Sequence, residues 1–140
     1  MKILLAVDGS LYTKKMLAYL TTHSELFTGS NEYTVFTAQP PLPARARAVV
    51  NKDVADTFHA EESEKVLAPV CAFLLRHNIN ASSAWKIGHT GESIAQFAAE
   101  GRFDLIVMGS HGHSALVNLV MGSVATQVLA HSAVPVLLVR

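Results

Sequence analysis

The stretch that decides the fold is residues 103–126, FDLIVMGSHGHSALVNLVMGSVAT. Its apolar run, residues 105–108, stops at Gly109, as a buried parallel strand does at the edge of a sheet. Beyond the run lie three small residues, Gly112, Gly122 and Ser123. Apolar residues then recur at helical spacing, so a helix is expected to begin near Ser123. A strand, a glycine-rich loop and a helix start favour phosphate binding, because glycines admit an anion close to the backbone and free amides point toward it.

Length and composition indicate one domain, residues 1–140, with a full hydrophobic core. Eleven basic and eleven acidic side chains balance, which gives no electrostatic case for nucleic acid or an anionic membrane as partner. No apolar run approaches the roughly 20 residues that cross a bilayer. The single cysteine, Cys71, cannot form an internal disulfide, which suits a reducing compartment. A cytoplasmic location is therefore expected.

Apolar strand patterns alternate with helical patterns along the chain. Strands are expected at residues 3–7, 33–38, 81–87, 104–108 and 136–139. Helices are expected at residues 12–20, 51–77, 90–100 and from about 123 to 131. This alternation predicts an α/β fold with a doubly wound parallel sheet and helices on both faces.

Three features between these elements carry further expectations. Residues 39–45 contain three prolines, which predict an irregular, ordered loop or lid. Pro69 falls inside the long helical stretch and predicts a kink or a junction of two helices. Thr90 is expected to cap the helix that follows it, and Gly101 to end that helix.

Asp8 follows the first strand directly, as Gly109 follows the fourth. Ligands of such folds bind at the carboxyl ends of the strands, where the strand order reverses. If the first and fourth strands are neighbours, the Asp8 loop and the glycine loop face one crevice. Two separate signals in the sequence then predict one site.

These motifs resemble a known family. The run from Met108 to Gly112, nine further residues and then Gly122-Ser123 resembles the ATP-binding signature of the universal stress protein family. The resemblance extends over the whole chain, from Asp8 to the closing apolar strand. It implies a five-stranded Rossmann-like sheet of order 3-2-1-4-5 that binds adenine nucleotide.

The resemblance and the loop pattern together define a set of candidate nucleotide-binding residues: Val7, Asp8, Ala38, Met108, Gly109, His111, Gly112, Gly122, Ser123 and Val124. By resemblance, Asp8 contacts the adenosine part, with a contact through a divalent cation as the open alternative. Ala38 matches the position that recognises adenine through backbone groups. His111 is expected to donate a hydrogen bond to the phosphates.

The resemblance also implies the ligand and the partners. ATP is the expected nucleotide, with ADP or AMP as alternatives, with or without Mg²⁺. A homodimer is expected through the last strand, from Val134 to Val139, because an apolar strand at a sheet edge requires a cover. The implied role is a stress-response or signalling regulator that acts on an unidentified protein partner.

Other interpretations remain open at this point. Asp8 can simply cap the first helix, and the glycines can serve turn geometry alone. The same fold can act as a dimeric interaction module without nucleotide, or as a slow ATPase. No P-loop lysine motif is present, and the histidines do not show zinc-like spacing. The sequence therefore indicates a site that holds nucleotide rather than one that cleaves it quickly.

Overall fold

The computed structural model describes residues 1–113 and 120–140, and its centre is a parallel five-stranded sheet of order β3-β2-β1-β4-β5. The strands are β1 Lys2–Ala6, β2 Glu32–Gln39, β3 Ala81–Ile87, β4 Leu105–Gly109 and β5 Val136–Val139. The expected strand order is confirmed. The central strands β1, β2 and β4 are mostly buried between the helices on the two faces, whereas the edge strands β3 and β5 are only partly buried.

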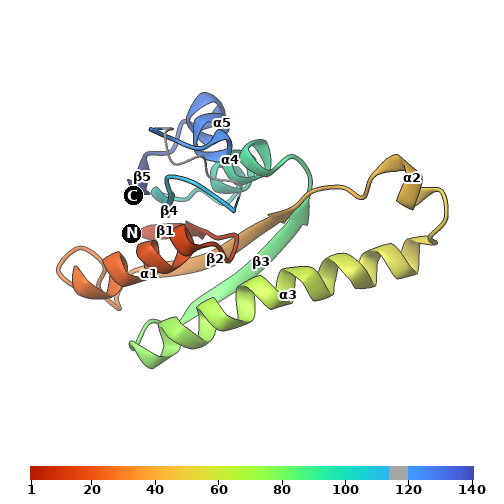
Figure 1. Cartoon of the computed structure of the whole chain (residues 1–140). Helices are drawn as coiled ribbons and strands as arrows, with labels where there is room; N and C mark the ends of the chain where they lie inside the picture. Colours follow the sequence, from red (N-terminus) through yellow and green to blue (C-terminus); the bar gives the residue numbers. More distant parts are fainter. Residues whose placement is uncertain (114–119) are drawn as a thin grey trace.

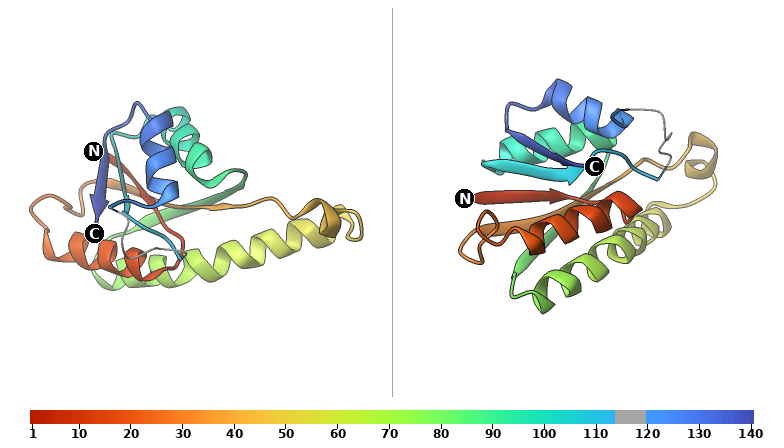
Figure 2. Two further views of the ribbon diagram at one scale, coloured as in Figure 1. Left: turned by 45° about the horizontal axis from the view of Figure 1, so that its top comes forward. Right: turned by 60° about the vertical axis from the view of Figure 1, so that its left-hand side comes forward.

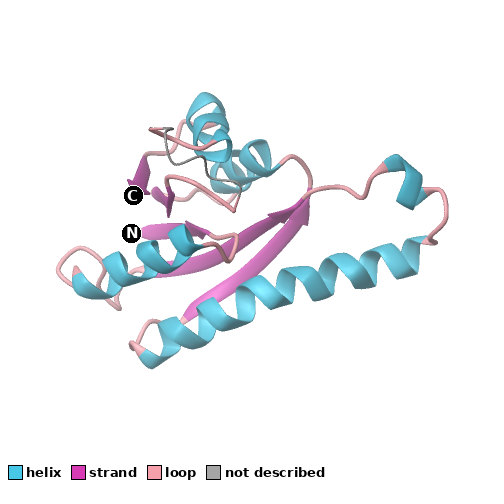
Figure 3. Ribbon diagram, viewed as in Figure 1, coloured by secondary structure: helices cyan, strands magenta, loops and turns pink. Residues whose placement is uncertain are grey.

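Helices cover both faces of this sheet (Figures 1 and 2). The helices are α1 Leu11–Thr22, α2 Ala44–Arg47, α3 Lys52–Arg76, α4 Thr90–Glu100 and α5 Ser123–His131. Helices α1 and α3 lie on one face, and α4 and α5 lie on the other, as Figure 3 shows in cyan against the magenta strands. The doubly wound arrangement expected from the alternating pattern is therefore correct.

Alternate residues of each strand supply two separate core layers. In β1, Ile3 and Leu5 face α1 and α3, whereas Leu4 and Ala6 face α4 and α5. The first three are completely buried and Ala6 is nearly so. This period of two is the geometry of a strand with both faces covered, and it holds the ends of β1 and β4 rigidly in register.

The register brings the expected loops together. Ala6 pairs with Met108 in β4, and Ala6 also pairs with Phe36 in β2. The residues after Ala6 and Met108 therefore emerge side by side at the carboxyl edge of the sheet. This is where the strand order reverses between β1 and β4.

Two local expectations were wrong, and so was one alternative of a third. Gln39 belongs to β2, and Ala44 and Arg45 begin the short helix α2, so only residues 40–43 of this segment lack regular structure. The N-cap of α4 is His89, and Thr90 is its first helical residue. Helix α3 runs through Pro69 as one helix rather than two. Pro69 faces solvent, so the carbonyl that loses its hydrogen bond can be hydrated.

Helix α3 differs along its length. Its second half packs on the sheet through Leu67, Val70 and Leu74. Its first half and α2 project beyond the sheet as an arm, on the right of Figure 1. Cys71 is partly buried against the core of this face, and burial raises the pKa of its thiol, which keeps the group protonated.

Across residues 1–113 and 120–140, no helix has both the length and the apolar character that a membrane crossing needs.

Candidate functional site

A pocket of about 540 Å³ opens at the carboxyl ends of β1, β2 and β4. All ten candidate residues line it, from three strand ends, two loops and the start of α5: Val7, Asp8, Ala38, Met108, Gly109, His111, Gly112, Gly122, Ser123 and Val124. The pocket is large enough for a small organic ligand such as a nucleotide. The structure therefore brings the two separate sequence signals into one cavity.

The loop after β1 is fixed by hydrogen bonds around Asp8. Its Oδ1 accepts from the Ser10 amide at 2.9 Å and from the Thr13 hydroxyl at 3.0 Å. The Asp8 amide in turn donates to Thr13 Oγ1 at 3.2 Å. Gly9 has a φ of +77°, which a glycine adopts without steric cost. One carboxylate oxygen of Asp8 thus organises the loop and the start of α1.

The described ends of the loop after β4 pack closely around its glycines. A Cβ on Gly109 would lie 2.6 Å from Cβ of Tyr12 in α1. A Cβ on Gly122 would lie 3.1 Å from Cα of His111 and 3.2 Å from the Ser110 carbonyl oxygen. Both glycines therefore allow close approach of protein to protein, and neither has a positive φ.

Gly112 differs from the other two glycines. Among the described residues, the nearest atom to a Cβ added there is Oδ2 of Asp8, at 2.8 Å. Gly112 therefore lies directly beside this carboxylate, at the wall of the pocket. Of the three loop glycines, it is the one whose missing side chain keeps space in the cavity itself.

Helix α5 begins at the pocket wall. Its N-cap is Gly122, which offers no capping side chain, so the first-turn amides of Ser123 and Val124 point toward the pocket end. The Gly122 amide donates to the Ser110 carbonyl at 2.7 Å and ties the helix start to the end of β4. Such a helix start favours an anion through its free amides and its dipole.

His111 is held between two neighbours. Its ring centroid lies 4.9 Å from that of Tyr12, and its Nδ1 lies 2.8 Å from the Ser110 hydroxyl. Ser110 is 2 % exposed, so this hydroxyl is a buried support for the imidazole. This hydrogen bond gives Ser110 a structural role in the loop.

Ala38 presents backbone groups to the pocket. The Phe36 carbonyl accepts from the Val7 amide, so Phe36 directs its backbone groups toward β1. Ala38 lies two residues further and directs its own groups to the same side. Because β1 ends at Ala6, the Ala38 amide and carbonyl reach the space beyond that strand. An amide and a carbonyl side by side can pair with a base edge.

Several lining residues were not found from the sequence. They extend the pocket wall along α1, the end of β2, α3, α4 and the glycine loop: Thr13, Thr37, Gln39, Pro40, Val66, Thr90, Ile94 and His113. Pro40 lies inside the loop expected at residues 39–45, and Thr90 was expected to cap the following helix. Neither expectation placed these residues in the pocket wall. Val66 lies in α3, far from the glycine loop in the sequence, and no local sequence pattern indicated that it lines the pocket.

The pocket wall has little positive charge. Asp8, His111 and His113 are its titratable side chains among the described residues. Arg45 and Arg47 lie on the arm and do not line it. Within residues 1–113 and 120–140, no three His, Cys, Asp or Glu side chains gather closely enough to hold a metal ion. The wall offers amides, hydroxyls and imidazoles to a ligand.

A doubly wound α/β protein with a ligand pocket at its switch point is the class that this fold and site define. The family model described as the universal stress protein family matches residues 1–140, and the chain belongs to that family. A universal stress protein of Synechocystis sp. is 32 % identical over 139 residues, which are 99 % of this chain and 42 % of that protein. A universal stress protein of Thermus aquaticus is also 32 % identical, over 99 % of this chain and 97 % of its own.

Solved structures share the fold. UspA from Lactobacillus plantarum superimposes with a TM-score of 0.80 at 18 % identity, over 100 % of this chain and 97 % of its own. An Arabidopsis thaliana family member with AMP bound gives 0.69 at 16 % identity, over 99 % and 90 %. The Archaeoglobus fulgidus protein in complex with dAMP gives 0.65 at 20 % identity, over 100 % and 98 %. At these identities the likeness shows the fold.

Proposed function

We propose that the chain binds an adenine nucleotide, ATP or its products ADP and AMP, in this pocket and acts as a stress-response or signalling regulator. The observation that carries the proposal is the convergence of all ten candidate residues on one cavity at the switch point. Adenine nucleotides in two solved family members support the ligand class. A nucleotide-free interaction module would not require such a cavity.

The pocket suggests an orientation for the ligand. Adenine lies at the end of β2, where the Ala38 amide donates to a ring nitrogen and the Ala38 carbonyl accepts from the amino group. The ribose lies against Asp8, whose Oδ2 lies beside Gly112. The phosphates lie at the start of α5, where the amides of Ser123 and Val124 and the His111 imidazole donate to them. Mg²⁺ accompanies ATP as a counter-ion, with no protein ligand assigned to it.

Hydrolysis of the bound nucleotide is expected to be slow. The glycine loop carries no lysine for the transferred phosphate. Turnover is therefore expected well below the median of about 10 per second for enzymes. Turnover above about one per second in protein free of contaminating ATPases would make the chain an enzyme instead.

A homodimer through β5 belongs to the same proposal. Strand β5 lies at the edge of the sheet, and Val136, Leu137 and Leu138 are half-buried there. An exposed apolar edge favours pairing with a second chain. We expect Val136→Lys to convert a dimer into a monomer in sedimentation experiments. Wild-type protein that sediments as a monomer at micromolar concentration would contradict the dimer without affecting the pocket.

The cellular part of the proposal rests on the family and on the reducing context indicated by Cys71. The protein is expected to work in the cytoplasm and to present a nucleotide-dependent surface to a protein partner not yet identified. The Thermus aquaticus relative matches over 97 % of its length, so a chain of this size occurs as a family member in its own right.

The direct test of ligand class is to denature purified protein and to identify the released nucleotide by mass. Titration of ATP, ADP, AMP and adenosine into nucleotide-free protein then ranks them. Adenine nucleotide is expected, with guanosine nucleotides binding much more weakly because Ala38 offers the wrong donor and acceptor order. Protein that binds no adenine ligand at millimolar concentration would contradict the proposal.

A further inference from the structure

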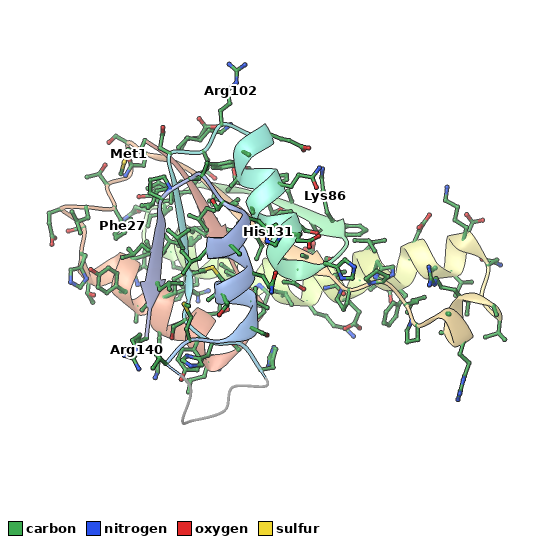
Figure 4. All side chains as sticks on the ribbon, turned by 90° about the horizontal axis from the view of Figure 1, so that it is seen from above. Met1, Phe27, Lys86, Arg102, His131 and Arg140 are labelled. Atoms are coloured by element: carbon green, nitrogen blue, oxygen red, sulfur yellow. The ribbon has the colours of Figure 1, made fainter. Side chains whose placement is uncertain are left out.

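The positive charge needed to hold phosphate is scarce over the whole pocket end of the molecule. Between Arg102 and Arg140 the sequence has no lysine or arginine, so the glycine loop and α5 carry none. Figure 4 shows Arg102 directed outward at the far end of α4. Arg140 follows β5 at the carboxyl edge, is exposed and does not line the pocket. The one side chain with a fixed charge among the described residues that line the pocket is Asp8, which is negative.

His113 lines this pocket, and the sequence reading had assigned it no role. Its Nε2 lies 2.7 Å from the carbonyl oxygen of Asp8. A carbonyl oxygen accepts and cannot donate, so Nε2 carries the hydrogen in this contact. In the neutral ring, Nδ1 then holds a lone pair, which an anion does not favour. A proton on Nδ1 converts the same ring, in the same position, into a donor to phosphate.

We propose that His113 is a proton-dependent phosphate ligand, so that binding of the nucleotide's phosphate group is coupled to uptake of a proton at this imidazole. The inference rests on the proposed nucleotide binding and adds a regulation to that site. Imidazoles gain and lose their charge near neutral pH, so the coupling acts over the physiological range. Linkage sets the sign: an anion that favours the protonated ring takes up protons as it binds, and its affinity rises as pH falls.

The groups around the ring agree with this direction. Asp8 contributes the carbonyl contact to Nε2, and Oδ2 of its carboxylate lies beside Gly112, the residue before His113. From α1, Lys15 lies over the Tyr12 ring, 4.8 Å from its centroid, and does not line the pocket. From α4, His89 and Glu92 border a neighbouring hollow that meets the pocket at Ser123. His111 lies on the same loop and is held by Ser110 and Tyr12.

The test is calorimetric titration of wild-type protein with AMP and with adenosine, which lacks the phosphate. The range runs from about pH 7 to pH 8.5, above the pKa near 6 at which a phosphate monoester gains its second proton. AMP affinity is expected to fall about five- to tenfold across the range, whereas adenosine affinity changes less than about twofold. Titration of AMP in two buffers of different ionisation enthalpy counts the protons taken up directly and needs no variant.

Three variants test which side chain takes up the proton when AMP binds. His113→Gln keeps an amide donor for the Asp8 carbonyl but cannot titrate, so the pH slope for AMP should disappear. His111→Gln should retain the slope. Arg140→Gln should also retain it, because a guanidinium does not titrate in this range.

Each contrary result has a separate meaning. A wild-type AMP affinity that does not change with pH, or no proton uptake in calorimetry, would overturn the inference while leaving nucleotide binding intact. A slope that survives in His113→Gln, or that disappears in His111→Gln, would overturn the assignment to His113. Failure of both adenosine and AMP to bind at any pH would contradict the proposed function itself.

Discussion

The two loops that form the pocket are held in place by different means. The loop after β1 is held by hydrogen bonds, in which one oxygen of Asp8 serves both the Ser10 amide and the Thr13 hydroxyl. The loop after β4 is held by packing, because Gly109 and Gly122 let backbone segments approach more closely than any side chain would allow. Glycine-rich loops can thus serve two purposes at once, to admit a ligand and to let the protein pack on itself.

The largest effect is expected at the packed loop. Gly109→Ala places a Cβ 2.6 Å from Tyr12 Cβ and 3.2 Å from Tyr12 backbone atoms, so α1 or β4 must move. We expect a loss of about 3 kcal/mol in the free energy of unfolding, at the upper end of overpacking costs. Chemical denaturation measures it.

Gly29→Ala is the matched control, because its added Cβ meets only the Asn78 carbonyl oxygen, at an ordinary 3.5 Å. Equal losses in the two variants would show that Gly109 has no special packing role.

The second prediction distinguishes a glycine needed for protein packing from a glycine needed for nucleotide binding within the same loop. Gly112→Val adds its side chain toward Asp8 Oδ2 and into the cavity rather than against backbone. We expect nucleotide affinity to fall by about two orders of magnitude, about 2.7 kcal/mol, with a much smaller loss of stability than in Gly109→Ala. Titration and thermal melting of the same samples measure both quantities. Normal binding by folded Gly112→Val protein would place the phosphates elsewhere.

The third effect concerns the start of α5. Ser123→Ala removes one hydroxyl donor to a charged phosphate but leaves the backbone amides of the helix start. We expect a loss of about 1.5 kcal/mol in binding, roughly tenfold, with stability unchanged. Ser132→Ala, at the other end of the same helix, is the control for binding. No change in ATP affinity on Ser123→Ala would assign phosphate recognition to the amides alone.

The smallest effect is expected at the hydrogen-bonded loop. Thr13→Val keeps the shape of a buried side chain but leaves the Asp8 amide without its acceptor and removes a donor to Oδ1. We expect about 1 kcal/mol of lost stability and a modest loss of affinity. If Thr13→Val lost more stability than Gly109→Ala, the hydrogen-bonded loop and not the packed loop would contribute more to the stability of the fold.

The sequence predicted the sheet well because most of its strands are short apolar runs, followed closely by glycine, proline or Asp8 and separated by helical patterns. It predicted the candidate site because Asp8 and the glycine loop both follow strands that become neighbours. The reason for Gly109 could not be predicted, since its packing partner Tyr12 lies at the other end of the chain. His113 was missed for the same reason: its contact with the Asp8 carbonyl exists only once β1 and β4 pair. The three prolines before Ala44 indicated irregular structure, so the helix that begins at Ala44 and Arg45 was not predicted.

The central claim is that adenine nucleotide occupies the pocket between these two loops. The most direct measurement is a heteronuclear NMR titration of isotope-labelled protein with ATP and with AMP, read at assigned backbone amides. We predict that the largest shifts occur together at Asp8, Ala38, Gly112 and Ser123, while amides at the outer end of α3 do not move. Saturating nucleotide that leaves those four amides unchanged, or that shifts a separate surface, would contradict the account.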